Sequence, residues 1–186
     1  MQLKKIHLLL FSLILLNVLP SIAQEFKKNA AYIELGGNAE FYSINYDRIL
    51  PISTQFKIVP RVGFMYLPLN RIKDNYDFTT IRVPIELNLL WAKRAESKNF
   101  AEAGVGLNLI GMKKYTGYYF DRNVYENKFA KVTTIRLGFR HQKPTGGLMY
   151  RAGLLIPITQ DRFSESRVGD DIFYRLYAGF SLGYSF

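Results

Sequence analysis

Apolar and polar residues alternate with a period of two along most of this chain, and this alternation constrains the fold more than any other feature of the sequence. From Tyr174 to Phe186 every second residue is apolar or aromatic, whereas most of the residues between them are small or polar. The same spacing recurs at 81–91, 101–109 and 135–139. Because successive side chains of a β-strand point to opposite faces, the pattern predicts amphipathic strands and argues against helices.

Residues 1–23 have the composition of a secretory signal peptide. Lys4 and Lys5 give a positive start, an apolar run follows at 8–16, and small residues lead up to Ala23. The apolar run is too short to cross about 30 Å of hydrocarbon comfortably as a helix. We therefore expect cleavage between Ala23 and Gln24, and export of one mature domain, residues 24–186.

The composition excludes several classes of protein. The chain has 186 residues, a net charge of +10 and no cysteine, so disulfides and thiolate metal sites are excluded. Its mean hydropathy of −0.04 is far below that of a multi-span helical membrane protein. Aromatic residues make up 15% of the chain and the tyrosines are spread along it, which is typical of strands and membrane interfaces.

The alternating runs predict strands whose connections are alternately long and short. Short turns at one end and long loops at the other are typical of an up-and-down barrel in a bacterial outer membrane, with the short turns in the periplasm. We therefore expect an all-β fold, an eight-stranded antiparallel transmembrane barrel. The expected strands are 30–38, 42–50, 55–67, 79–91, 100–110, 131–142, 148–158 and 173–186.

A soluble, lipocalin-like barrel is the alternative fold, because it would place the apolar face inward around a ligand. The aromatic residues of the apolar face favour the membrane barrel, since they fall at two levels near the strand ends, as the two interfaces of a bilayer select. One level holds Tyr42, Tyr66 and Tyr174, and the other holds Phe56, Trp91, Tyr150, Tyr184 and Phe186.

The end of the chain resembles a known targeting signal. Residues 179–186, with Phe180, Leu182, Tyr184 and a terminal Phe186, look like the C-terminal strand that the barrel assembly machinery reads in outer-membrane barrels. Residues 32–38, 42–47 and 82–87 resemble the small outer-membrane β-barrel family of Bacteroidota-type bacteria, akin to OmpA/OmpX-like barrels. The resemblance implies an outer-membrane, porin-like class of fold in contact with membrane lipid and lipopolysaccharide, and implies no particular activity.

Ionisable residues on the inward parity predict a charged lumen. An eight-stranded barrel is just wide enough for side chains, so we expect these ions to pair and plug it, with an anion-lined pore as the alternative. We expect Arg61 to meet Glu86, and Glu102 to meet Arg140 or Arg151. The expected network is Glu34, Asp47, Arg61, Arg82, Glu86, Glu102, Arg136, Arg140, Arg151 and Arg175, with Lys57 on the same face.

Three prolines lie inside expected strands, where a residue without an N–H interrupts the hydrogen-bond ladder. We expect β-bulges at Pro60, Pro84 and Pro157.

The connection at 111–130 combines basic and aromatic residues and is a candidate surface site. It could bind the phosphates of lipopolysaccharide or a surface partner, whereas an exported protein rarely meets nucleic acid, so none is expected. The alternative is a hairpin that extends beyond the membrane and pairs tyrosines across its strands. The candidate residues are Lys113, Lys114, Tyr115, Tyr118, Tyr119, Arg122 and Lys128.

The sequence contains no metal-ligand spacing, no glycine-rich phosphate loop and no nucleophile motif. The mature chain has one histidine, His141, which we expect at the periplasmic rim, facing outward. We therefore expect a structural or surface-interaction protein with no catalytic residues, metal or cofactor. A lipid-modifying enzyme that uses only carboxylates on the same barrel remains the alternative function.

Overall fold

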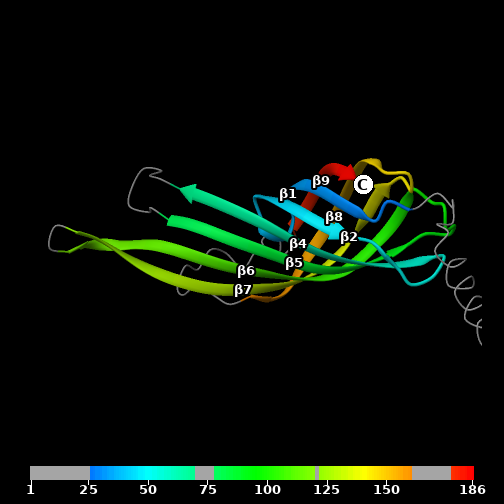
Figure 1. Cartoon of the computed structure of the whole chain (residues 1–186). Helices are drawn as coiled ribbons and strands as arrows, with labels where there is room; N and C mark the ends of the chain where they lie inside the picture. Colours follow the sequence, from blue (N-terminus) through cyan, green and yellow to red (C-terminus); the bar gives the residue numbers. More distant parts are fainter. Residues whose placement is uncertain (1–25, 70–77, 120–121, 161–176) are drawn as a thin grey trace, which may run out of the picture.

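The computed structural model describes residues 26–69, 78–119, 122–160 and 177–186, and these form a closed antiparallel β-barrel (Figure 1). Each strand pairs with its neighbours in sequence, and β9 pairs with β1 to close the barrel. The expected eight-stranded up-and-down fold is confirmed, because β2 and β3 are two parts of one barrel strand interrupted at Ile49. The elements are β1 Asn29–Gly36, η1 Gly37–Ala39, β2 Tyr42–Arg48, β3 Leu50–Pro51, β4 Phe56–Leu69, β5 Phe78–Trp91, β6 Asn99–Tyr119, β7 Arg122–Gln142, β8 Gly147–Gln160 and β9 Tyr177–Ser185.

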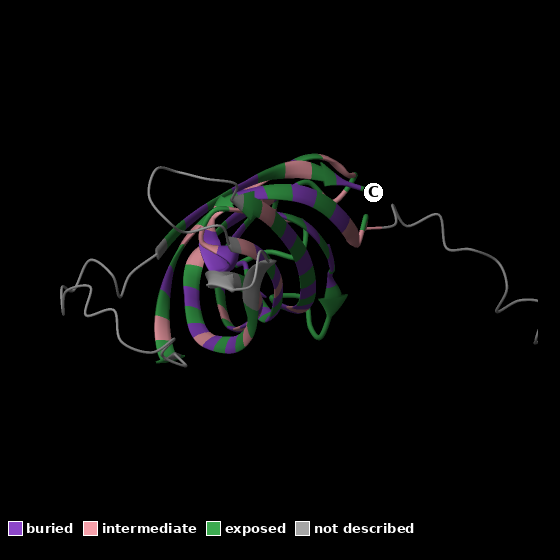
Figure 2. Ribbon diagram, turned by 90° about the vertical axis from the view of Figure 1, so that its left-hand side faces the viewer, coloured by how far each residue is buried: buried purple, intermediate pink, exposed green. Residues whose placement is uncertain are grey.

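The apolar face of every strand points outward. Exposed and buried residues alternate along the strands around the ring (Figure 2). In β5, for example, Ile85 and Leu87 are 43% and 51% exposed, whereas Glu86 between them is 3% exposed. This polarity is the reverse of that of a soluble ligand-binding barrel, whose apolar side chains line the interior.

The two ends of the barrel differ. Lys27, near the start of the described chain, and Phe186 lie at the end that carries the short connections 52–55, 92–98 and 143–146, which we call the turn end. At the opposite end β6 and β7 continue as a long hairpin that projects from the barrel (Figure 1). The expectation of a loop at 111–130 was wrong, because β6 and β7 continue to pair there as an extended hairpin, with Tyr115 opposite Tyr125 in the register. The position of this hairpin beyond a membrane stays a prediction.

The strand bounds differ from the expected ones at two other points. The first strand ends at Gly36 rather than at residue 38, because η1 turns inward there. The last strand is described from Tyr177 onward, and the part expected at 173–176 lies outside the described residues.

The prolines are accommodated in two ways. Only Pro157 lies beside a bulge, where the β7–β8 register shifts between Thr133 and Thr134. The bulges expected at Pro60 and Pro84 were wrong, since the β4–β5 register is the same before and after them. Instead the ladder has gaps: Pro60 faces the break between β2 and β3, and no pairing joins Pro84 to Gly63. Because the parity of β4 is unchanged, Arg61 faces inward as expected.

Candidate functional site

The centre of the lumen holds a network of buried ion pairs that joins opposite walls of the barrel. Arg136 of β7 donates to Glu34 of β1 (2.7 Å), and its Nε lies 3.1 Å from Oε2 of Glu86 on β5. Arg61 of β4 pairs with both carboxylates, with 2.8 Å between its Nη1 and Oε2 of Glu86. All four side chains are at most 1% exposed, so each charge relies on the others in place of water.

A second group extends the network towards the turn end. Arg151 of β8 donates to Glu102 of β6 at 2.5 Å and to the hydroxyl of Tyr32 at 2.7 Å. Its Nη2 also lies 3.4 Å from Glu86. The guanidinium carbons of Arg61 and Arg151 each lie 5.6 Å from the centre of the Tyr32 ring, so two cations contact this ring.

A third group pairs Asp47 with Arg140 across the lumen from β2 to β7. Arg140 donates from Nη1 and Nη2 to the two carboxylate oxygens, at 2.7 and 2.8 Å. Two parallel hydrogen bonds of this kind are the strongest geometry available to a guanidinium and a carboxylate. Arg140 also donates to Gln142, whose own amide donates to the backbone carbonyl of Lys27 (3.0 Å).

These contacts can be compared with the ion pairs expected from strand parity. Arg61 meets Glu86, its partner in the β4–β5 register, and Glu102 meets Arg151. Arg140 does not pair with Glu102, because Asp47 occupies its guanidinium. Arg175 lies outside the described residues. The other expected network members line the lumen in a buried position: Glu34, Asp47, Arg82, Glu86, Glu102, Arg136, Arg140 and Arg151.

The segment after β1 folds into the mouth opposite the turn end. Gly37, Asn38 and Ala39 of η1 are all buried, and the Asn38 carbonyl accepts a hydrogen bond from Asn108 at 2.6 Å. Gly37 has a φ of +66°, and a Cβ there would lie 2.3 Å from the Glu34 carboxylate, so the turn requires glycine. Glu40 then pairs with Arg82 at 2.7 Å. This part of the lumen is therefore filled by the chain itself.

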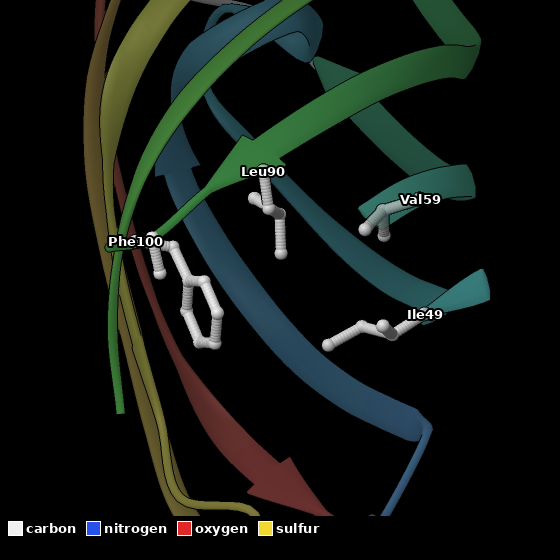
Figure 3. Packing of buried hydrophobic residues seen from close by; sticks show 5 residues of the cluster. Ile49, Val59, Leu90 and Phe100 are labelled. Atoms are coloured by element: carbon white, nitrogen blue, oxygen red, sulfur yellow. The ribbon is translucent and has the colours of Figure 1, made fainter. Parts of the chain in front are cut away.

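An apolar cluster fills the turn end of the lumen. The side chains of Ile49, Val59, Leu90 and Phe100 point towards one another there (Figure 3), and Phe26 packs against them. Nζ of Lys57 has no hydrogen-bond partner in the described part of the chain and lies 4.9 Å above the Phe100 ring. The Lys57 charge is thus held by an aromatic face rather than by a carboxylate.

The remaining predicted residues lie on the projecting hairpin, on β9 or outside the described residues. Lys113 and Lys128 lie on the projecting hairpin, where Lys128 is 3.4 Å from Glu126. The side chains of Lys114, Tyr115, Tyr118, Tyr119 and Arg122 lie outside the described part of the structure, as do Ala23, Gln24 and Tyr174. The assembly residues Phe180, Leu182, Tyr184 and Phe186 all face outward on β9 or at its end, and each is at least 50% exposed.

His141 lies at the turn end on the outer face. Its ring stacks on Tyr150, with 4.6 Å between ring centres, and Nδ1 is 2.7 Å from the Asn99 side-chain oxygen. No lumen carboxylate takes part in these contacts, so the histidine packs with an outward-facing aromatic residue and an amide.

Some residues of the network were not predicted. Tyr32 and Gln142 were missed although strand parity could have found them, since they share faces with Glu34 and Arg140. The inward turn at η1 had a signal in the consecutive glycines Gly36 and Gly37, which are strand breakers. Nothing in the sequence indicated that Glu40 would reach Arg82.

Among the described residues there is no group of three metal-ligating side chains, and no helix long and apolar enough to cross a membrane. No known family model matches the chain, and no curated protein matches it. Among solved structures it is similar to the crystal structure of Acinetobacter baumannii CarO, with 12% identity and a TM-score of 0.48, over 86% of this chain and 96% of that one.

Proposed function

We propose that this protein is an integral outer-membrane β-barrel with a closed, non-conducting lumen and a structural or surface-interaction role. The observation that carries the proposal is the polarity of the wall, which is apolar outside and ionic inside. In water the outer face would be an apolar patch far larger than soluble proteins expose. In a bilayer the same face is satisfied by lipid, and the closed ladder leaves no free strand edge.

The outward aromatic residues indicate how deep the barrel lies in the proposed membrane. Phe56 and Trp91 are opposite each other in the β4–β5 register, and Tyr184 and Phe186 end β9 at the same turn end of the barrel. Tyr42 and Tyr66 occupy the opposite level, where the Tyr42 hydroxyl donates to the Tyr66 carbonyl. Two such aromatic levels match the two interfaces of a bilayer.

The lumen contents support a barrel that conducts no ions. Ion pairs cross the centre from wall to wall, η1 fills one mouth and the apolar cluster around Leu90 and Phe100 fills the other. The buried carboxylates of the described lumen all lie within ion-pair distance of arginines, and we propose no catalytic role for them. A role at the cell surface fits the β6–β7 hairpin, which extends past the barrel with Lys113 and Lys128 on it.

Trp91 provides the test of membrane position, because it is the chain's single tryptophan and is 47% exposed on the outer face. Purified protein is reconstituted in vesicles whose lipids carry bromine near the headgroup or near the chain end. We expect stronger quenching of Trp91 by the bromine near the headgroup, and retention of the protein in the membrane fraction after a carbonate wash. Unquenched fluorescence with release by carbonate would contradict the proposal and favour a soluble barrel.

A further inference from the structure

Near the turn end, the outer wall carries an exposed charge beside apolar residues. Arg48 ends β2 on the outward parity, exposed, and it forms no ion pair with any residue that the structure describes. It lies directly opposite Asn29 in the β1–β2 register. Because the backbone of Asn29 bonds Phe186 of β9 in both directions, the Asn29–Arg48 pair is of the non-hydrogen-bonded kind, in which side chains approach most closely.

The neighbouring side chains complete a set of donors. The Tyr46 hydroxyl donates to Oδ1 of Asn29 at 2.8 Å, which fixes the amide so that its nitrogen Nδ2 is free to donate elsewhere on the same face. A guanidinium and an amide nitrogen side by side match the oxygens of a phosphate. Arg48 and Asn29 lie at the level of Phe186, at the turn end of the barrel. In the proposed membrane position they therefore lie at the interface rather than in the hydrocarbon.

An apolar hollow begins at this set of donors. It has a volume of about 710 Å³ and runs over the outer face of β2, β4, β5 and β6. Its walls include Tyr46, Pro60, Val62, Leu87 and Val105, with Arg48 as its exposed cation. This volume lies in the range of pockets that hold small ligands, about 300–1,000 Å³.

The charge of the turn end favours an anionic occupant. Among the residues described there, exposed or half-buried basic side chains outnumber acidic ones, and Glu96 carries the acidic side chain. The basic residues are Lys27, Lys28, Arg48, Lys93, Arg94, Lys98 and Lys143. Cations of this kind at a membrane surface attract anionic lipid headgroups.

We propose that Arg48 and Asn29 bind the phosphate of an anionic phospholipid whose acyl chain lies in the hollow beside Val62 and Leu87. This inference rests on the proposed membrane position of the barrel. It adds a specific lipid site in the leaflet next to the turn end, on the opposite side of the membrane from the β6–β7 hairpin.

The experiment titrates the purified full-length mature protein with phosphatidylglycerol or phosphatidylcholine of identical acyl chains, and counts retained lipids by native mass spectrometry. Both lipids carry the phosphate, but the choline cation of phosphatidylcholine offsets its charge and is repelled by the basic turn end, so we expect retention of phosphatidylglycerol at roughly tenfold lower concentration. Arg48→Gln should remove this preference, whereas Arg94→Gln, which removes an equal charge from the 92–98 turn, should keep it. Val62→Phe, which fills the hollow, should weaken retention of both lipids.

The other outcomes overturn the proposal. Equal losses in Arg48→Gln and Arg94→Gln would show diffuse attraction without a site. Displacement of the lipid by inorganic phosphate at equal concentration would show an anion site that ignores the acyl chain, and a dimer in place of bound lipid would show that a second copy covers the hollow. Quenching of Trp91 by brominated lipid is measured in each variant, because its loss in the wild type would contradict the membrane position itself.

Discussion

At the scale of single residues, the buried carboxylates of the barrel interior differ in the number of arginines that they meet. Glu86 lies within ion-pair distance of Arg61, Arg136 and Arg151, so the loss of one arginine leaves it two partners. Asp47 differs, because Arg140 is the cation that meets both of its oxygens. Removing one member of such a buried pair leaves the other charged and unpaired, which costs more than removing both.

We therefore predict strong coupling between Asp47 and Arg140. Asp47→Asn or Arg140→Gln alone should lower the free energy of unfolding by about 3–5 kcal/mol, and the double variant should lose much less than the sum. The measurement is the urea midpoint in detergent, supported by heat-modifiable gel mobility. Glu126→Gln is the control, because the exposed Glu126–Lys128 pair should contribute less than about 1 kcal/mol. Additive losses in the Asp47 and Arg140 variants would show that the pair does not form.

At the scale of strands and turns, the parity of each strand was predictable, whereas the ion pairs across the lumen were not. A period of two assigns Arg61 and Glu86 to one face, and neighbouring strands bring them together. The Asp47–Arg140 pair joins strands that are not neighbours, so it depends on how the barrel closes, which no local pattern encodes. The lengths of β6 and β7 were missed because the outer face becomes polar beyond the apolar band, at Lys113 and Lys131, although the pairing continues.

The turn at η1 gives a prediction at this scale. Gly37→Ala should destabilise the barrel by about 1–3 kcal/mol, since an L-residue is disfavoured at a φ of +66° and the new methyl group would meet the Glu34 carboxylate. Gly111→Ala is the matched control, because a Cβ at Gly111 has no neighbour within 4 Å. The urea midpoints of the two variants are compared with that of the wild type. Equal midpoints for Gly37→Ala and Gly111→Ala would mean that η1 does not pack against Glu34.

The terminal strand gives a second prediction. Phe186 exchanges two backbone hydrogen bonds with Asn29, at 3.1 and 2.9 Å, and so takes part in closing the barrel. Deletion of Phe186 should lower the amount of protein in the outer membrane several-fold, as measured by fractionation and immunoblotting. Phe56→Ala removes an outward aromatic residue of the same level away from the closing strand, and should leave the amount near normal. Normal abundance of the deletion variant would exclude a role of Phe186 in assembly.

At the scale of the whole molecule, the proposed role depends on what occupies the lumen along its length. The apolar cluster around Phe100, the crossing ion pairs and η1 follow one another along the described lumen, and the outer wall around them is mostly apolar. Such an interior is what we expect of the proposed non-conducting barrel.

Conductance tests this view directly. Purified protein in planar bilayers should show no stable open state over the range of voltages that the bilayer tolerates. Arg136→Ala removes a central cation that bridges Glu34 and Glu86, and serves as the diagnostic variant. A steady anion-selective current in the wild type that disappears in Arg136→Ala would show that the lumen is a pore.

The crossing ion pairs also bear on the order of folding. Arg140 meets Asp47, and Arg136 meets Glu34, only after the C-terminal half of the chain has been brought against the first two strands. In the proposed membrane setting, an open, partly assembled sheet would present these charges singly to lipid, at a cost of several kcal/mol each. Intermediates in the bilayer are therefore high in free energy, which makes insertion cooperative, and the finished barrel is protected from unfolding by the same barrier that opposes its assembly.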